Sequence, residues 1–492
     1  MICGMGIVAG IECSSQFTKI VVCDAETGTI LRQGHAPHPD LPGPREKTEI
    51  DPQAWLLSLG EAAAGGLLEG VQAIGIAAQQ HGLLALDAGG VLVRPAILWN
   101  DKRATGAAAD LVEALGGPAG WAQAVGFVPQ AASTVAKLRW LAQAEPLSAQ
   151  RTAEVLLPHD WLTWQLLGRP AARCTDRGDV SGTGYWSAAT GEYRTDLVEL
   201  ALGHPVALPR VLGPAEPAGH TPEGLLISAG TGDTMAAALG LGIGPGDAVV
   251  SLGASSTIFA VHGEPLVDPA GTIASFADAT GHHLPMVHTL NASRVLRGTA
   301  ELLGLELETL SELALRSTPG ASGLVLLPYL EGERTPYLPH TAGTLAGLRR
   351  ESMKREHLAR AAVEGMLCGL ADALDVLRGR GVQVRRVFLL GATANLPAVR
   401  QLAPLFFGAP VTVPRPAEYA ALGAARQAAW VLAGERTGAV AAQPPQWPTL
   451  DSEPGPEPGE EDLAIGAAVR QQFGAVRDDT HPDAFARTPQ LS

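Results

Sequence analysis

The sequence has few cysteines, and they follow no pattern that would join them to one another or to a metal. It contains five, an odd and scattered set without a Cys-x-x-Cys pair: Cys3, Cys13, Cys23, Cys174 and Cys368. Its thirteen histidines also lack ligand spacing, although His282, His283 and His288 come nearest to it. A disulfide framework and a zinc site are therefore not expected, and we predict buried, reduced thiols.

Basic residues are scarce relative to acidic ones. There are 35 Lys and Arg against 50 Asp and Glu, a formal net charge of -15, and no segment concentrates the cations. Nucleic acids and anionic membranes are bound largely through cations that neutralise phosphates, so neither is an expected partner. Residues 1–16 lack the basic start and apolar stretch of a signal peptide, and no run approaches the ~20 apolar residues of a membrane span. We expect a cytoplasmic protein.

The composition is typical of a large, loop-rich α/β enzyme. Hydrophobic residues make up 46% and charged residues 17% of the 492 positions, with 58 glycines and 37 prolines. This length exceeds that at which one hydrophobic core usually keeps growing, so two domains of roughly 200–250 residues are expected. Apolar runs and their periodicity predict strands at 73–78, 84–86, 155–157 and 387–390, and helices at 52–68, 104–115, 135–144 and 356–377.

Two segments have the same outline of a strand, a bend of small residues and a second strand. The first bend contains Ser14, Ser15 and Gln16, and the second contains Gly253, Ala254 and Ser255. Such bends are either ordinary hairpin turns or cradles in which backbone N–H groups converge on an anion. Because each hairpin would begin one half of the chain, we expect a duplicated architecture. We divide it into 1–243, 244–443 and a tail of 444–492, in which a Pro- and Glu-rich linker precedes a last helix and a frayed end.

One acidic residue stands between an apolar run and an alanine-rich stretch, in ISAGTGDTMAAALG (227–240). Asp233 has two interpretations at this strand-to-helix junction: a helix cap that accepts a backbone N–H, or a reactive carboxylate. No GxxxxGK[ST] segment occurs, so a P-loop phosphate site is excluded. A GxGxxG dinucleotide motif after a strand is also missing, and nothing marks the partner acid that a two-carboxylate glycosidase would need.

Eight motifs occur in an order that resembles the FGGY carbohydrate kinases. They are QQHG (79–82), RPAILWNDKR (94–103), LPHDWLTWQLLG (157–168), TDRGDVSGTGYW (175–186), GTGDT (230–234), SLGASS (251–256), LPYLEGERTPYLP (327–339) and EYAALGAARQAAW (418–430). Each motif alone is weak, but eight in order are specific.

The resemblance implies an α/β, two-domain actin- and hexokinase-like (ribonuclease H-like) fold with an interdomain cleft. The implied reaction is ATP-dependent phosphorylation of D-xylulose to D-xylulose 5-phosphate, with Mg²⁺ as cofactor and a homodimer as a common assembly. By resemblance, Asp233 is the catalytic base, and Gln80, His81, Asp233 and Thr234 bind the sugar.

The nucleotide residues are also implied only by the resemblance. Those expected near the phosphates of ATP are Ser14, Ser15, Gln16, Lys19, Gly253, Ala254 and Ser255, and those expected near the adenosine are Gly391, Ala392 and Asn395. Glu12 and Asp233 are the expected metal-binding residues.

The sequence departs from the family at four places among the residues expected to bind the sugar, the nucleotide and the metal. Glu12 replaces an Asp, with Ser14 and Ser15 following in place of Gly and Thr. The second bend reads LGASS instead of LGTSG, LLGATANLP (389–397) replaces a glycine-rich adenosine segment, and Thr234 replaces an Asn. We expect Ala392 and Thr393 to add side chains to the adenosine surface. These departures leave open a kinase for another ketose or polyol, or a sugar-binding pseudokinase.

Two further expectations concern residues near these motifs. Trp99, Trp161 and Trp164 occupy apolar positions and are expected in the core instead of at a sugar-stacking surface. His81 has an alternative interpretation as a core histidine at the end of a strand.

Overall fold

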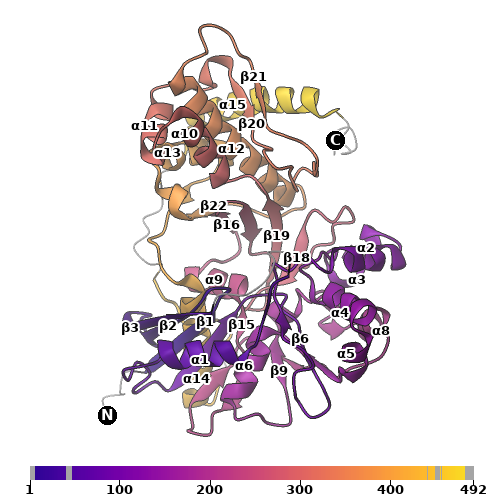
Figure 1. The fold of residues 1–492 in the computed structure, drawn as a ribbon. Helices are drawn as coiled ribbons and strands as arrows, with labels where there is room; N and C mark the ends of the chain where they lie inside the picture. Colours follow the sequence, from indigo (N-terminus) through magenta and orange to yellow (C-terminus); the bar gives the residue numbers. More distant parts are fainter. Residues whose placement is uncertain (1–5, 40–46, 440, 449–454, 456, 483–492) are drawn as a thin grey trace. The chain divides into compact units, whose positions relative to one another are not determined.

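The computed structural model describes residues 6–39, 47–439, 441–448, 455 and 457–482 (Figure 1). The chain forms two compact units. Unit 1 comprises Met1–Ile243, Gly263–Leu284 and Ala417–Thr449, and unit 2 comprises Gly244–His262, Pro285–Pro416 and Leu450–Ser492. The first division lies where the sequence-based boundary was drawn, but two later segments return to unit 1. The units are therefore not consecutive stretches of chain.

Unit 1 is built on a mixed sheet with the strand order β13-β14-β5-β1-β2-β3, in which β15 also pairs with β5. The strands are β1 (Ile7–Cys13), β2 (Phe17–Asp24), β3 (Ile30–Pro37), β5 (Ala73–Ala78), β13 (Pro217–His220), β14 (Leu226–Ser228) and β15 (Thr231–Gly232). β1, β2 and β3 pair antiparallel, whereas β1, β14 and β15 run parallel to β5. Every residue of β5 is buried, as expected of a central strand covered on both faces.

Helix α14 (Tyr419–Thr437) packs directly on the backbone of this sheet. A Cβ added to Gly10 of β1 would lie 1.8 Å from the carbonyl oxygen of Ala421, and one added to Gly75 of β5 would lie 2.0 Å from that of Ala424. Two glycines thus let the helix approach more closely than side chains would permit. Helix α9 (Asp233–Leu241) contacts α14 through a similarly close pair of glycines, Gly240 and Gly423.

The other face of the sheet is covered by a large apolar core. Its members include Trp55 of α1 (Gln53–Ala62) and Trp161 of α6 (Pro158–Leu166), whose rings meet edge to face at 6.1 Å. The remaining helices of unit 1 are α2 (Thr105–Ala114), α3 (Pro118–Val125), α4 (Thr134–Ala144), α5 (Pro146–Arg151), α7 (Arg177–Val180) and α8 (Thr195–Leu202). Its short strands are β4 (Glu49–Ile50), β6 (Leu84–Leu86), β7 (Ala96–Ile97), β8 (Glu154–Leu156), β9 (Cys174–Asp176), β10 (Trp186–Ser187), β11 (Glu192–Tyr193), β12 (Arg210–Leu212) and β18 (Ala274–Ala277).

Unit 2 has its own mixed sheet, in which strands follow the order β19-β17-β16-β22-β23. These are β16 (Asp247–Leu252), β17 (Ser256–Ala260), β19 (His283–Thr289), β22 (Arg386–Leu390) and β23 (Val411–Thr412). Its helices are α10 (Ser293–Leu303), α11 (Leu307–Leu315), α12 (Arg355–Arg378), α13 (Pro397–Phe407) and α15 (Glu460–Thr480), and β20 (Val325–Leu327) pairs with β21 (Thr344–Ala346). Both expected hairpins are present, β1–β2 in unit 1 and β16–β17 in unit 2.

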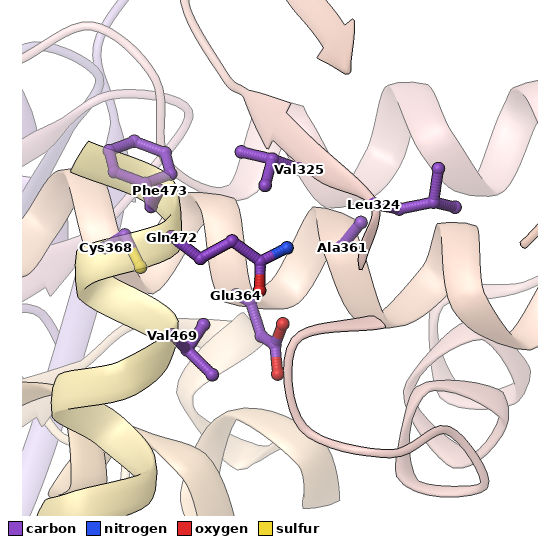
Figure 2. A pocket seen from close by; sticks show the side chains of 8 residues that line it. All are labelled: Leu324, Val325, Ala361, Glu364, Cys368, Val469, Gln472 and Phe473. Atoms are coloured by element: carbon purple, nitrogen blue, oxygen red, sulfur yellow. The ribbon is translucent and has the colours of Figure 1, made fainter. Parts of the chain in front are cut away.

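The last helix is fixed to unit 2 by ion pairs. Arg470 of α15 contacts Asp372 at 3.0 Å and Asp375 at 2.6 Å, both on α12, and Arg477 also pairs with Asp372. Figure 2 shows the side chains lining a cavity between these helices, including Glu364 and Gln472. Its volume of about 10 Å³ leaves room for one water at most, so it is not a substrate site.

Several sequence-based expectations can be compared directly with this fold. The strand predicted at 73–78 matches β5, and the helix predicted at 356–377 matches α12 to within a residue at each end. The helix predicted at 52–68 is wrong in length, since α1 ends at Ala62 and Gly65 and Gly66 adopt positive φ angles. Parts of the predicted linker (449–454 and 456) and of the predicted frayed end (483–492) lie outside the described residues.

The expectations for cysteines, metals and membrane spans have these outcomes. Cys13, Cys23 and Cys368 are buried free thiols, Cys174 is a free thiol that is only partly buried, and Cys3 lies outside the described residues. Among the described residues no group of three His, Cys, Asp or Glu side chains could hold a metal ion. In the same part of the chain, none of the helices has the length and apolar character needed to cross a membrane.

Candidate functional site

Three parallel strands of unit 1 end at one edge of the sheet. Cys13 at the end of β1 and Gly232 at the end of β15 both align with Ala78, the last residue of β5. The residues that follow these strands therefore share this edge, where open α/β sheets usually bind ligands. These residues include the predicted Ser14, Gln80 and Asp233.

Asp233 is the first residue of α9, and the helix cap itself is Gly232. Its Oδ1 accepts hydrogen bonds from the backbone N–H of Thr234 (2.7 Å) and from the Thr234 hydroxyl (3.2 Å). The carboxylate binds a backbone N–H of the first helical turn, but Asp233 is not the helix cap that one interpretation of the sequence expected. Within the described residues no hydrogen bond occupies Oδ2. Burial and then the negative charge of Glu12 raise the pKa of Asp233 to about 6.

Glu12, Lys19 and Glu418 form a line of alternating charge beside the β1–β2 hairpin. Glu12 and Lys19 are paired residues of the two strands, and Lys19 Nζ lies 3.8 Å from Glu12 Oε2 and 2.5 Å from Glu418 Oε2. Burial raises the pKa of Glu12, and the charge of Lys19 opposes this shift. Glu418, which directly precedes α14, was not predicted as a site residue, although it begins the EYAALGAARQAAW motif.

The two acids predicted to bind metal, Glu12 and Asp233, suit a magnesium site to which the protein contributes only two ligands. Mg²⁺ keeps several waters and is usually held by one or two carboxylates together with substrate phosphates. The negative charge of Glu12 contributes to the raised pKa of Asp233, so the two carboxylates interact electrostatically.

The first hairpin bend is held by its own side chains. The Ser14 hydroxyl donates to the Phe17 carbonyl at 2.9 Å and accepts from the Phe17 N–H at 3.2 Å. Trp99 Nε1 donates to Ser15 Oγ at 2.8 Å, and Gln16 is exposed. The expectation that Trp99 lies in the core is wrong, because 47% of its surface is exposed, whereas Trp161 and Trp164 are buried as expected. Trp99 instead supports the bend that contains Ser15.

His81 has a constrained backbone and a fixed ring. Its φ angle is 65°, uncommon for a residue with a side chain, and its carbonyl accepts from Lys137 Nζ at 2.5 Å and from the Thr134 hydroxyl at 3.3 Å. The ring places Nδ1 2.9 Å from the Gly182 carbonyl and lies 5.9 Å from the Phe276 ring. His81 is only partly buried, so it is not a fully enclosed core histidine.

The sequence did not predict a buried cluster whose member Asp179 interacts electrostatically with Asp233. We call it the acid–imidazole cluster: His159, Asp160, Asp176 and Asp179. His159 Nδ1 lies 2.7 Å from Asp179 Oδ2, and its Nε2 lies 3.2 Å from Asp160 Oδ1 and 3.7 Å from Asp176 Oδ1. Burial opposes the imidazolium, but the three carboxylates outweigh it and raise the pKa of His159 to about 9. His159 is therefore a cation at neutral pH.

The cluster is joined to β15, the strand that directly precedes the catalytic candidate. Asp176 caps α7 by accepting from the N–H groups of Gly178 and Asp179, and it also accepts from the hydroxyl of Thr231 at 2.7 Å. Thr231 lies two residues before Asp233. The motifs LPHD and TDRGD contained these acids, but their spacing in the sequence could not show that they surround one histidine.

The predicted nucleotide residues from Gly253 onward belong to unit 2 and lie on two of its loops. Gly253, Ala254 and Ser255 form the exposed β16–β17 bend. The bonds that fix this bend use carbonyl oxygens: that of Gly253 accepts from the Ser293 hydroxyl at 2.6 Å, and that of Ala254 accepts from the Ala292 N–H at 3.2 Å. These bonds do not occupy the N–H groups expected to face phosphate.

The segment expected near the adenosine follows β22. Ala392 and Asn395 are exposed, whereas Thr393 is buried, so the expectation that Thr393 adds a side chain to this surface is wrong. Gly391 has a φ of 106°, and a Cβ there would lie 2.3 Å from the Leu252 carbonyl oxygen. This glycine is required by its contact with β16.

Comparisons with known proteins define the class to which this fold and site belong. Residues 7–240 match the N-terminal domain, and residues 248–432 the C-terminal domain, of the FGGY family of carbohydrate kinases. The chain belongs to this family, so the predicted family and its two-domain α/β fold are confirmed.

Comparisons with individual relatives are more specific than the match to the family. The chain is 43% identical over 446 residues to a xylulose kinase of Streptomyces coelicolor, a match that covers 88% of this chain and 90% of the relative. It is 31% identical over 445 residues to a xylulose kinase of Haemophilus influenzae, covering 86% and 90%. A crystal structure of xylulose kinase from Bifidobacterium adolescentis is similar with a TM-score of 0.87 and 39% identity, over 96% of this chain and 99% of the other.

Proposed function

We propose that the protein transfers the γ-phosphoryl group of ATP to D-xylulose and forms D-xylulose 5-phosphate. The observation that carries this proposal is the 43% identity to the Streptomyces coelicolor xylulose kinase over 88% of the chain. The geometry of unit 1 supports it, because a carboxylate of raised pKa lies at the strand edge shared with the expected sugar-binding residues. The proposal includes a cytoplasmic location and assembly as a homodimer.

Asp233 acts as the base in this proposal. Its carboxylate accepts the proton of the sugar hydroxyl that attacks the γ-phosphorus, and a pKa near 6 keeps it ionised yet basic at neutral pH. The bond from the Thr234 N–H to Oδ1 orients the group. Because a loose phosphoryl transition state needs mainly positioning and neutralised charge, one carboxylate is a sufficient base.

The remaining roles follow the same proposal. Gln80, His81 and Thr234 bind sugar hydroxyls, and Glu12 and Asp233 bind Mg²⁺. When bound, the metal neutralises charge on the phosphates. The residues proposed for ATP are Ser14, Ser15, Gln16, Lys19, Gly253, Ala254, Ser255, Gly391, Ala392 and Asn395.

Thr234 favours one alternative, a kinase for another ketose or a polyol. The family has Asn at this position, and the shorter Thr both contacts Asp233 and removes an amide that could reach a sugar hydroxyl. A sugar-binding protein without turnover is a further outcome of the same test.

The test is ADP release with D-xylulose, compared with a panel of other ketoses, glycerol and gluconate. Asp233→Asn is the matched control, since an Asn side-chain oxygen can still accept the Thr234 N–H. We expect D-xylulose to have the highest kcat/KM and the variant to lose ~10²–10⁴-fold in kcat. A higher kcat/KM for another sugar would favour the alternative kinase. Calorimetric sugar binding without ADP release from any sugar would identify a pseudokinase.

A further inference from the structure

One oxygen of Asp179 lacks a partner although the residue is fully buried. Asp179 has no exposed surface, and its Oδ2 lies 2.7 Å from His159 Nδ1. Its Oδ1 is buried without any hydrogen-bond partner in the described part of the chain. A buried carboxylate oxygen left unpaired is costly, so this acceptor requires a partner that the described residues do not provide.

A second buried polar atom without a partner is a donor. The Nε2 of Gln80, a residue with 7% exposure, also has no partner among the described residues. Both side chains lie against Gly232, the residue before Asp233: a Cβ added there would be 2.6 Å from Gln80 Cγ and 3.2 Å from Asp179 Oδ1. One acceptor and one donor, both unsatisfied, thus adjoin the same glycine beside the proposed base.

A second glycine continues this arrangement toward His81. A Cβ on Gly182 would lie 2.8 Å from His81 Cε1, and the Gly182 N–H donates to the Asp179 carbonyl. Side chains at Gly182 and Gly232 would therefore collide with the polar side chains that lie against these glycines. We call this group of residues the hydroxyl site, defined by Gln80, His81, Asp179, Gly182 and Gly232.

His159 keeps the Asp179 carboxylate oriented. Because its Nδ1 holds Oδ2, rotation of the carboxylate is restricted and Oδ1 remains on the side of Gly232. Burial raises the pKa of Asp179 to about 6, while the hydrogen bond and charge of His159 oppose the shift. At neutral pH the hydroxyl site therefore contains an ionised acceptor, which makes stronger hydrogen bonds than a neutral one.

We propose that Asp179 is a sugar-binding residue whose Oδ1 accepts a hydrogen bond from a substrate hydroxyl, while Gln80 Nε2 donates to the same or the adjacent hydroxyl. This inference rests on the proposed sugar kinase function and adds a residue to its site. A carboxylate only accepts and an amide nitrogen only donates, whereas a hydroxyl does both, so vicinal hydroxyls complement the pair. A metal ion fits less well, because no metal-binding group of three residues occurs in the described chain.

The test is a double-mutant cycle between the enzyme and the sugar. The values of kcat/KM are measured for D-xylulose and for three analogues that lack the hydroxyl at C1, C3 or C4, with wild type and Asp179→Asn. We expect one analogue to lose roughly 10- to 100-fold on wild type but less than about 3-fold on the variant, because the variant has already lost the ionised acceptor. Equal losses on both enzymes for all three analogues would overturn the role of Asp179.

Asp160→Asn is the matched control for effects transmitted through the imidazole. Asp160 lies at the other nitrogen of His159, so a merely structural role of the cluster would lower the melting temperature of both variants. We expect only Asp179→Asn to change the hydroxyl preference. A change of the same size in Asp160→Asn would contradict direct contact between Asp179 and the sugar.

Gly232→Ala provides a second test if Asp179→Asn fails to fold. The φ of −67° at Gly232 suits alanine, so the added methyl group affects mainly Gln80 and Asp179. We expect KM for the sugar to rise at least about 10-fold while KM for ATP changes less than about 3-fold. An unchanged sugar KM would refute the role of the hydroxyl site.

The wild-type rate with D-xylulose separates this inference from the proposed function. Normal wild-type turnover without the expected cycle would overturn only the role of Asp179. If wild type does not turn over D-xylulose, the proposed reaction fails, and the same cycle is run by calorimetry with the sugar of the panel that binds. Absence of binding by every sugar would overturn both.

Discussion

The carboxylate of Asp233 must meet two requirements if it is to act as a base. It must be ionised to accept a proton, and its pKa must also be close to the pH of the solution. Burial and the charge of Glu12 resolve this by raising its pKa to about 6, while the bond from Thr234 stabilises the charged form. The local environment thus suits Asp233 to act as a base at neutral pH.

This environment predicts the acid limb of the pH–rate profile. Asp233 is ionised above its pKa and protonated below it, so kcat/KM should fall with falling pH around a midpoint near 6. Glu12→Gln removes a charge that raises this pKa, and its residual activity should therefore show a midpoint at lower pH. The profile is measured between pH 4.5 and 8 for both proteins. A midpoint that moves upward in Glu12→Gln would contradict the assigned cause.

Lys137 predicts a second effect at the residue scale. This fully buried lysine donates to the carbonyls of His81 (2.5 Å) and Ala132 (2.7 Å), and burial lowers its pKa to about 7. It holds His81 in its uncommon left-handed backbone conformation, which costs of order 1 kcal/mol or more. Lys137→Met should therefore raise KM for the sugar about 10-fold, with little change in KM for ATP, in steady-state assays.

The same variant should alter how stability depends on pH. Between its folded pKa of about 7 and the ordinary value of 10.5, Lys137 binds more protons in the unfolded chain than in the folded protein. It therefore makes the free energy of unfolding rise with pH across this range, by up to about 1.4 kcal/mol per unit. Denaturant unfolding at pH 7 and 9 should show that Lys137→Met loses this rise relative to wild type. A constant difference between the proteins would refute the lowered pKa.

The sequence allowed only part of this site to be predicted. Asp233, Gln80 and His81 could be proposed because they belong to motifs at predicted strand ends. Glu418 and Lys137 could not, because their roles depend on contacts with Lys19 and His81, 399 and 56 positions away. The acid–imidazole cluster was missed for the same reason, since its charges are buried together only after folding.

At the scale of elements, α14 connects the packing of unit 1 to the position of Asp233. Gln427 on this helix accepts from the Ser228 hydroxyl (2.8 Å) and the Gly230 N–H (2.9 Å), and it donates to the Gly230 carbonyl (3.1 Å). One buried amide therefore satisfies both backbone groups of a glycine three residues before the proposed base. The helix thus holds Gly230, and the acid–imidazole cluster holds the next residue in the sequence, Thr231.

Gln427→Ala should weaken both stability and catalysis. It leaves the N–H and carbonyl of Gly230 without their buried partner, a loss of about 1–3 kcal/mol for an unsatisfied group. We expect a lower melting temperature and roughly a 10-fold lower kcat, because Asp233 would be held less tightly. Thr437→Ala, at the exposed end of the same helix, is the control. Wild-type kcat in Gln427→Ala would show that this amide does not position the base.

Element prediction succeeded where burial alone determines the structure. The run AIGIAA was identified as a strand because every position is apolar or glycine, and all of β5 is buried. The end of α1 was misplaced because Gly65 and Gly66, which adopt positive φ after the helix, were not taken as a stop. Local chemistry contained that signal, whereas the pairing of α14 with β1 and β5 depends on the fold as a whole.

At the scale of the whole molecule, the two units are not made of consecutive stretches of the sequence. A consecutive division assigned 244–443 to one domain, but Ala417–Thr449 belongs to unit 1. The cause lies in backbone contact: Gly10 and Gly75 admit α14 against β1 and β5. Motif order could identify the family, but it could not show which sheet this helix covers.

The inclusion of α14 in unit 1 predicts that the first 243 residues do not fold alone. Without α14, the faces of β1 and β5 at Gly10 and Gly75 are uncovered, and the amide partner of Gly230 is missing. A fragment of residues 1–243 should therefore lack a cooperative thermal transition and bind a hydrophobic dye, as loosely packed states do. Joining residues 417–449 to it through a flexible linker should restore a cooperative transition, measured by near-UV circular dichroism. The same fusion with Gly10→Val should behave like the short fragment, since any Cβ there would collide with the Ala421 carbonyl. If residues 1–243 alone unfold cooperatively at the melting temperature of the fusion, α14 does not stabilise the sheet of unit 1 and the prediction is wrong.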